Sequence, residues 1–198
     1  MKSNAVKSVD LKIDWSAQTI LPIEFRGREI MLDARAYQGV EPHVQALALI
    51  HRSKDTANDE VPLVRVHSGC VTGDIFHSLK CDCYAQLQAA IDRITSTPVG
   101  VLIYLPYHDG RGIGLVNKIR AYALQDQGLD TVDANIEIGA PIDAREYDLA
   151  AHILFDLGMP EVRLLSNNPA KVEALRAEGV KVSEQVAVHT EPSMYNKR

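Results

Sequence analysis

The 198-residue chain is 46% hydrophobic and 24% charged, proportions typical of a folded globular protein with one sizeable domain or two small ones. Its 21 basic and 26 acidic side chains give a net charge of −5, which argues against a general nucleic-acid binder but leaves room for a local basic pocket. No apolar run approaches the length of a membrane span, the first residues lack a signal-peptide core, and three cysteines supply no disulfide framework. We therefore expect a cytoplasmic enzyme with no membrane and no nucleic-acid partner.

The first third of the chain is expected to form antiparallel β structure, after a loose N-terminus at residues 1–8. Polar–apolar alternation and short apolar runs predict a strand over 9–15, a hairpin over 21–34 with Gly27 in its turn, and strands over 44–51 and 61–67. The polar residues 53–60 between the last two strands predict a loop.

From residue 82 onward the apolar spacing becomes that of helices, which alternate with strands. Helices are predicted over 82–96, over 114–127 before Gly128, over 146–157 before Gly158, and from Asn168 as N-cap to Gly179; strands are predicted over 99–105, 161–165 and 180–186. The expected fold class is α/β in the mixed α+β sense: an N-terminal antiparallel β region, then alternating helices and strands, layered around a mixed sheet in a single domain over 1–198.

All three cysteines lie in the stretch 65–86, at positions 70, 81 and 83. Three thiolates within fourteen residues suit a tetrahedral zinc ion with three protein ligands, whose fourth position stays open for water. Zinc lowers the pKa of such a water to roughly 7, so hydroxide becomes available at neutral pH. Two alternatives remain open: three small buried apolar side chains, or a closed site in which His67 or His77 is the fourth ligand.

Two loops have the composition of phosphate or nucleobase sites. The glycine-rich segment 109–114 lies between a predicted strand and a helix, where backbone N–H groups point outward. The segment 166–171 follows a strand at the end where layered α/β proteins bind ligands, and its Lys171 is long enough to reach a phosphate. A tight turn and simple helix capping are the respective alternatives.

Two further groups of polar residues have an ordinary structural interpretation. Asp143 and Arg145 precede a helix, where an N-cap and a surface charge would suffice. Lys118 and Arg120 are expected on the solvated face of their helix, and Tyr122 at helical spacing is more typical of a core position.

Together these motifs resemble the GTP cyclohydrolase II family over roughly residues 20–190. The matching segments are RVHSGCVTGD at 65–74, KCDC at 80–83, DGRGIGL at 109–115, NKIRAYALQDQG at 117–128 and LSNNPAK at 165–171. The family carries out the first step of riboflavin synthesis: it opens the imidazole ring of GTP, expels C8 as formate and releases diphosphate. Its product is 2,5-diamino-6-ribosylamino-4(3H)-pyrimidinone 5′-phosphate.

The resemblance implies one zinc ion per subunit, held by Cys70, Cys81 and Cys83. It also implies GTP as substrate, Mg²⁺ bound with the triphosphate, and a homodimer. Several cations in one pocket would explain how an acidic protein binds a polyanion.

By the same resemblance Asp143 is the general base, Arg145 attacks the α-phosphorus, and Tyr122 is the catalytic tyrosine near the ring being opened. A guanidinium is normally protonated and a poor nucleophile, so Arg145 has an alternative role in stabilising charge on the phosphorus. The implied GTP contacts are Arg65, Val66, His67, Ser68, Gly69, Gln86, Asp109, Gly110, Arg111, Thr131, Ser166 and Lys171.

The chain departs from the family pattern at two of these positions. Gly69 and Asp109 stand where the family usually has glutamates, so one carboxylate is lost and another is shortened. These departures indicate a specialised paralogue, for instance one that serves a secondary-metabolite pathway. The alternatives are an enzyme that stops at the formamidopyrimidine or acts on a related purine or pyrimidine nucleotide, and a zinc-stabilised nucleotide-binding protein without turnover.

Overall fold

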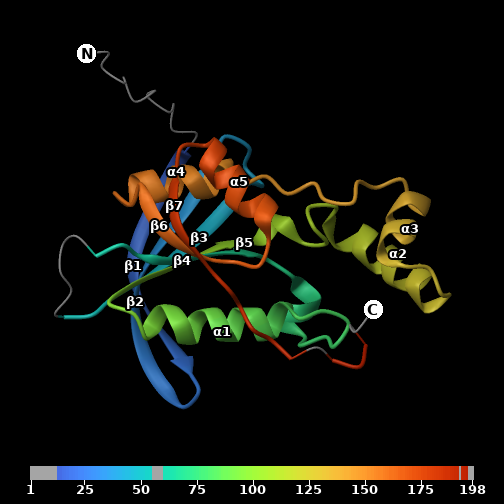
Figure 1. Cartoon of the computed structure of the whole chain (residues 1–198), viewed down its shortest axis with the longest axis horizontal. Coiled ribbons are helices and arrows are strands. Elements are labelled where there is room, and N and C mark those ends of the chain that lie inside the picture. The colour runs from blue at the N-terminus through green and yellow to red at the C-terminus, as the bar shows by residue number, and fades with distance from the viewer. Residues whose placement is uncertain (1–12, 55–59, 192, 196–198) are drawn as a thin grey trace.

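The computed structural model describes residues 13–54, 60–191 and 193–195 (Figure 1). Its centre is a seven-stranded mixed sheet with the order β1-β2-β3-β5-β4-β6-β7. The strands are β1 (Ile13–Phe25), β2 (Arg28–Gly39), β3 (Gln45–Arg52), β4 (Leu63–Ser68), β5 (Val99–Leu105), β6 (Glu161–Leu165) and β7 (Lys181–Val186). The predicted fold class is confirmed, because an antiparallel N-terminal region continues into alternating helices and strands.

The first hairpin is longer than the sequence pattern predicted. β1 and β2 are joined at Arg26 and Gly27, which both have positive φ, as a tight two-residue hairpin turn requires. The separate strand predicted over 9–15 is wrong in its described part: residues 13–15 begin the same strand that runs to Phe25, while residues 9–12, like the terminus 1–8, lie outside the described residues. Residues 16–20 extend the strand beyond the predicted hairpin; they are mostly polar and all exposed, so they lack the apolar alternation of a half-buried strand.

The direction of the strands changes within the sheet. β1, β2, β3 and β5 pair antiparallel, whereas β5, β4, β6 and β7 pair parallel. The carboxyl ends of the parallel strands therefore meet at one edge, where the chain leaves β4 after Ser68, β5 after Leu105 and β6 after Leu165. Ligands of open α/β sheets bind at such an edge.

Five α-helices and two single-turn helices complete the described part of the chain. They are η1 (Val71–Ile75), α1 (Cys83–Thr95), η2 (Pro106–His108), α2 (Gly114–Asp126), α3 (Thr131–Glu137), α4 (Asp148–Asp156) and α5 (Pro169–Ala177). Figure 1 shows α1 on one face of the sheet and α4 and α5 on the other, with α2 and α3 beside the parallel edge. No helix among the described residues combines the length and the apolarity that crossing a membrane requires.

Alternating residues of the central strands belong to two hydrophobic clusters, one on each face of the sheet. On β5, Val101 and Ile103 belong to the cluster under α4 and α5, while Leu102 packs with Ile94 of α1. Gly100 lets α1 approach very closely, because a Cβ there would lie 2.1 Å from the carbonyl oxygen of Ile94. This packing fixes α1, and with it the two cysteines at its N-terminal end.

Helix α3 and the turn η1 were not predicted. Helix α3 is seven residues long and follows Asp130, whose side chain accepts hydrogen bonds from the backbone N–H groups of Val132 and Asp133. Its apolar side chains Val132 and Ile136 remain exposed, so the segment lacks the pattern of a helix that packs on a core.

Candidate active site

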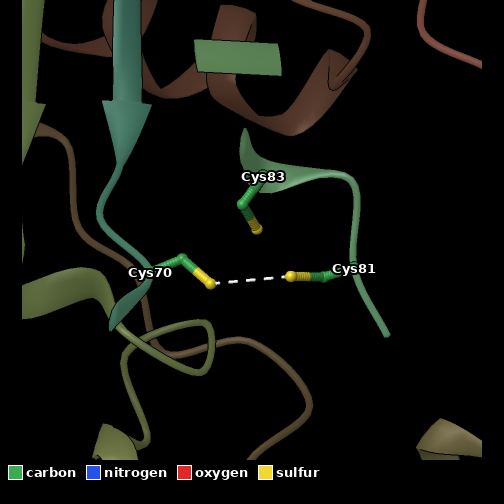
Figure 2. Close-up of side chains that lie close together, drawn as sticks. All are labelled: Cys70, Cys81 and Cys83. Atoms are coloured by element: carbon green, nitrogen blue, oxygen red, sulfur yellow. Dashed lines mark hydrogen bonds between the residues drawn. The ribbon is translucent and has the colours of Figure 1, made fainter. Parts of the chain in front are cut away.

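The three cysteine sulfurs converge on one point (Figure 2). Cys70 follows β4 and caps η1, whereas Cys81 and Cys83 lie at the start of α1. The three sulfur atoms lie within 4.8 Å of one another, and those of Cys70 and Cys81 are 3.7 Å apart. Two Zn–S bonds of about 2.3 Å at a tetrahedral angle separate their sulfurs by about 3.8 Å, so the trio fits zinc. Neither His67 nor His77 belongs to this group.

Glycine at position 73 makes the cluster possible. A Cβ at Gly73 would lie 2.8 Å from the sulfur of Cys81 and 3.0 Å from that of Cys70. Its backbone N–H donates a hydrogen bond of 3.1 Å to Cys70 Sγ. Hydrogen bonds from the thiols of Cys81 and Cys83, supported by Lys118, lower the pKa of the Cys70 thiol and favour its thiolate, the form that binds metal.

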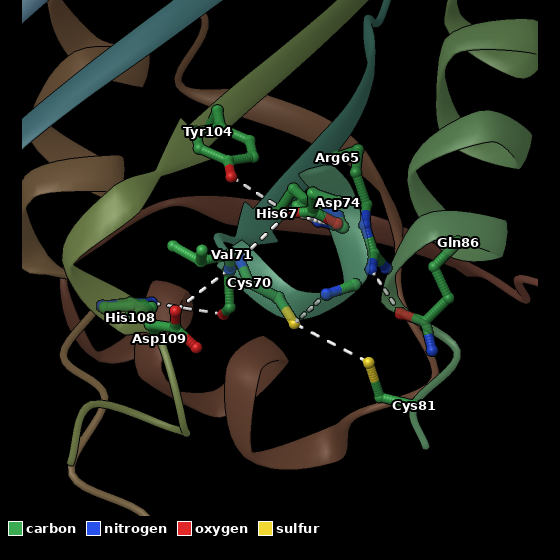
Figure 3. Close-up of polar contacts among 12 residues, drawn as sticks. Arg65, His67, Cys70, Val71, Asp74, Cys81, Gln86, Tyr104, His108 and Asp109 are labelled. Atoms are coloured by element: carbon green, nitrogen blue, oxygen red, sulfur yellow. Dashed lines mark hydrogen bonds and ion pairs between the residues drawn. The ribbon is translucent and has the colours of Figure 1, made fainter. Parts of the chain in front are cut away.

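A buried polar network supports the loop that carries Cys70 (Figure 3). One carboxylate oxygen of Asp74 accepts hydrogen bonds from the backbone N–H of Cys70 at 2.9 Å and from the hydroxyl of Tyr104 at 3.0 Å. His67 Nε2 lies 3.2 Å from both oxygens of the same carboxylate, and its ring is 2% exposed. Burial lowers the pKa of His67 despite Asp74, so the neutral ring serves this network rather than the thiol group.

A cavity of about 450 Å³ opens beside the thiols at the carboxyl ends of the parallel strands. It is lined by all three cysteines, by Tyr122 and Arg145, and by most of the predicted GTP contacts: Arg65, His67, Ser68, Gly69, Gln86, Gly110, Arg111, Thr131, Ser166 and Lys171. The structure thus brings together ten of the twelve predicted contact residues. Val66, Asp109 and Asp143 do not line the cavity.

Buried basic side chains line the cavity and offer partners to an anionic ligand. The guanidinium of Arg65 donates hydrogen bonds to the carbonyl oxygen of Leu165 at 3.1 Å and to Gln86 Oε1 at 2.7 Å, and burial lowers its pKa to about 10. Lys171 lies on α5, is 4% exposed, and has its pKa lowered well below the usual range by burial and by nearby Arg65 and Arg145.

Arg145 and Asp143 form a forked ion pair. Arg145 Nε donates to Asp143 Oδ1 at 2.8 Å, Nη2 donates to Oδ2, and the backbone N–H of Arg145 donates to Oδ1 at 3.1 Å. These bonds raise the pKa of Arg145. Burial alone would raise the pKa of Asp143, but the hydrogen bonds and the charge of Arg145 lower it overall. The intervening Ala144 donates its N–H to the carbonyl oxygen of Arg111 at 2.9 Å, which docks the pair on the glycine-rich loop.

The remaining predicted residues have structural surroundings. The Val66 side chain is fully buried, and its carbonyl oxygen accepts a hydrogen bond from Lys171. Asp109 is also buried: one carboxylate oxygen accepts from Lys118 Nζ at 2.9 Å, and the other accepts from the N–H of Val71 at 3.0 Å. Asp109 is therefore committed to contacts within the protein.

Lys118 was not predicted as a site residue, and its predicted environment was wrong. It was expected on a solvated helix face, but it is 8% exposed and lines the cavity, 2.7 Å from Cys70 Sγ. A signal was present: Lys118, Tyr122 and Gln125 recur at helical spacing, so one face of α2 points into the cavity. Arg120, two positions beyond Lys118, is exposed as expected.

Comparison with known proteins agrees with this geometry. The model of the GTP cyclohydrolase II family matches residues 16–187. The chain is 49% identical over 152 residues to GTP cyclohydrolase-2 of Streptomyces coelicolor, covering 77% of this chain and 67% of that one. It is 45% identical over 179 residues to GTP cyclohydrolase-2 of Archaeoglobus fulgidus, covering 90% and 45%, and 51% identical over 139 residues to the riboflavin biosynthesis protein RibBA of Aquifex aeolicus, covering 70% and 34%. The chain thus spans less than half the length of the last two relatives.

Proposed function

The chain belongs to the GTP cyclohydrolase II family, and we propose that it hydrolyses GTP to formate, diphosphate and the pyrimidinone ribosyl phosphate. The observation that carries this proposal is the shared cavity: a three-thiol group and several buried cations face the same 450 Å³ space. A Lewis-acid site beside an anion site is what ring opening of a nucleoside triphosphate requires. The name of the Aquifex aeolicus relative, riboflavin biosynthesis protein RibBA, supports a role in riboflavin biosynthesis.

We propose zinc as the ion held by Cys70, Cys81 and Cys83. Zinc would supply a Lewis acid that makes hydroxide available at neutral pH. The sulfur spacing of 3.7 Å and a donor set of three thiolates support this choice. All three cysteines are free thiols, which fits the cytoplasm proposed as the site of action.

The triphosphate is proposed to bind at the cations of the cavity. Lys171, Arg65 and Arg145 come from three different segments and line the cavity together with Ser166. Asn168, which caps the N-terminal end of α5, also lines the cavity, and backbone N–H groups at a helix start favour an anion. Mg²⁺ is proposed to accompany the triphosphate and to offset the charge that the protein leaves unpaired.

Arg145 is proposed to stabilise charge at the α-phosphorus rather than to attack it. Asp143 raises the pKa of Arg145, so the guanidinium remains protonated and lacks a free lone pair. The lowered pKa of Asp143 makes this carboxylate a weak base, and its proposed role is to orient Arg145. The forked geometry supports this assignment.

Tyr122 is proposed to donate a hydrogen bond to the ring that opens. Its side chain lines the cavity from the same face of α2 as Lys118. Burial raises the pKa of Tyr122 to about 12, so its hydroxyl is a donor at neutral pH.

A homodimer is proposed from the family resemblance. The apolar residues that α2 and α3 leave exposed offer a surface that such a dimer would bury: Leu115, Val116, Ile119, Val132 and Ile136. Light scattering of the purified protein measures the mass directly, and a monomer at all concentrations would contradict this part of the proposal.

The test of the proposed reaction follows formate and diphosphate separately, after incubation of the purified protein with GTP, Zn²⁺ and Mg²⁺. Release of both products, with the expected product mass, supports the complete reaction. Diphosphate without formate identifies a paralogue that stops at the formamidopyrimidine. The contacts of Asp109 with Lys118 and Val71 are a reason to test for this outcome, because they occupy a carboxylate that the family resemblance assigns to GTP. Release of neither product contradicts an enzyme acting on GTP.

A further inference from the structure

The buried amine of Lys118 lies between two anionic groups. Its Nζ is 2.7 Å from Cys70 Sγ and 2.9 Å from Asp109 Oδ1, and its side chain is 10% exposed. Burying an ammonium is costly unless it is paired. The carboxylate of Asp109 and the sulfur of Cys70 supply that pairing. The amine therefore keeps its charge in this position.

Asp109 connects Lys118 to the loop that carries Cys70. Its second carboxylate oxygen accepts a hydrogen bond from the N–H of Val71, the residue directly after Cys70 (Figure 3). Asp109 belongs to the glycine-rich loop, Lys118 to α2, and Val71 to η1. One carboxylate thus ties the lysine and the backbone of the cysteine loop together, which leaves the amine little freedom to leave the sulfur.

We propose that Lys118, held in place by Asp109, is a positioning residue for the metal-binding thiolate of Cys70. Its ammonium donates a hydrogen bond to that sulfur, directs it toward the other two thiols and withdraws electron density from it. This inference rests on the proposed metal site. Hydrogen bonds to ligand sulfurs tune a bound metal, because a sulfur that donates less to the ion leaves the ion more electrophilic.

The charges in the cavity indicate why a cation beside the thiolates is useful. Three thiolates and one divalent cation sum to −1, in a cavity proposed to receive a triphosphate. The ammonium of Lys118 faces the thiolate directly, whereas the charge of Asp109 is shared with the N–H of Val71. Lys118 therefore moderates the negative potential at the sulfur group.

Cobalt(II) provides the test, because the energy of sulfur-to-cobalt charge transfer reports the electron density on the thiolates. Lys118→Met removes the charge and keeps the length of the side chain, while Lys118→Arg keeps a charged donor. Arg120→Met is the matched control, since it removes one positive charge from an exposed position of the same helix. Each protein is loaded with one equivalent of Co²⁺, and its absorption spectrum and far-ultraviolet circular dichroism are recorded.

The charge-transfer band is expected to move to longer wavelength in Lys118→Met, to be largely restored in Lys118→Arg, and to stay unchanged in Arg120→Met. Asp109→Asn, which leaves the lysine but removes its ionic anchor, is expected to give a smaller shift in the same direction. It serves as the test if Lys118→Met does not fold. An unshifted band in folded, cobalt-loaded variants at positions 118 and 109 overturns the inference alone. A wild-type protein without any charge-transfer band overturns the proposed metal site, and the inference with it.

Discussion

The amine of Lys171 donates a hydrogen bond of 2.6 Å to the backbone carbonyl oxygen of Val66, across the boundary between α5 and β4. It also lies 5.2 Å above the ring of Tyr147. These partners are neutral, so burial and the charges of Arg65 and Arg145 lower the pKa of Lys171 well below its usual range. The cavity thus holds a lysine whose positive charge a bound anion would stabilise further.

Anion binding is therefore expected to be coupled to proton uptake at Lys171. Above its lowered pKa the free amine is neutral, and a bound diphosphate favours the ammonium, so affinity falls as pH rises through that pKa. Titration calorimetry with diphosphate at pH 8, in two buffers of different ionisation enthalpy, measures the protons taken up. Wild type should take up more protons than Lys171→Met. Lys181→Met, at an exposed lysine paired with Glu161, is the control and should match wild type.

Arg145→Lys is expected to reduce the turnover of GTP by about 10²- to 10³-fold, the usual effect of removing one transition-state donor. A lysine keeps the charge but cannot reproduce the forked contact with Asp143. Diphosphate release and the KM for GTP are measured together. A loss confined to KM would show that Arg145 contributes only to ground-state binding and contradict its proposed role at the phosphorus.

Tyr122→Phe is expected to slow formate release by about 10²- to 10⁴-fold, the range typical of a lost proton donor. Because burial raises the pKa of Tyr122 to about 12, the hydroxyl does not titrate near neutral pH. The ratio of wild-type to variant rates should therefore be constant between about pH 6 and 9. A ratio that changes across this range would assign the hydroxyl a different role.

Removing the metal should abolish the activity of the enzyme without unfolding it. Dialysis against a chelator is expected to abolish formate release, and Zn²⁺ should restore it in wild type but not in Cys81→Ser. Loss of the thiolate should weaken zinc binding by more than the roughly 10- to 100-fold that a lost second-shell partner costs. Cys81 belongs to neither hydrophobic cluster, so circular dichroism should be unchanged. An unfolded variant would instead favour a zinc-stabilised binding protein.

Residues close in sequence account for most of what could be predicted. Cys81 and Cys83 lie at one helix start, and Cys70 directly follows Gly69 at the end of a predicted strand, so the grouping of the thiols was predicted from their local spacing. Strands β5 and β6 were predicted with the observed bounds because each is a short buried run between turns. The loops predicted at the carboxyl ends of strands do line the cavity, as their position after short strands indicated.

Contacts between distant segments account for what was missed. The Lys118–Cys70 contact joins residues 48 positions apart. Helical spacing groups Lys118 with Tyr122 and Gln125, but it does not indicate that this face of α2 meets the cysteine loop. The burial of Asp109 has the same origin, since its partners Val71 and Lys118 lie in two other elements. Charged side chains tend to be solvated, but in these two residues tertiary packing buries the charge beside a partner.

Gly100→Ala is expected to destabilise the fold by about 1–3 kcal/mol and to weaken metal binding as well. A Cβ at position 100 would lie 2.1 Å from the carbonyl oxygen of Ile94 and 2.6 Å from its Cα, and backbone atoms cannot rotate away. Helix α1 must therefore move outward, and Cys83 is its first residue. Urea unfolding measures the stability, and competition with a chromophoric chelator measures the affinity for Zn²⁺.

The matched control is Gly27→Ala in the β1–β2 turn. That position has nothing within 4 Å of a new Cβ but a φ of 74°, so the substitution costs only the strain of a left-handed residue, about 1–2 kcal/mol. Its affinity for Zn²⁺ should equal that of wild type, because the turn does not support α1. If Gly100→Ala bound Zn²⁺ as tightly as Gly27→Ala, the placement of the thiols would not depend on how α1 packs against β5.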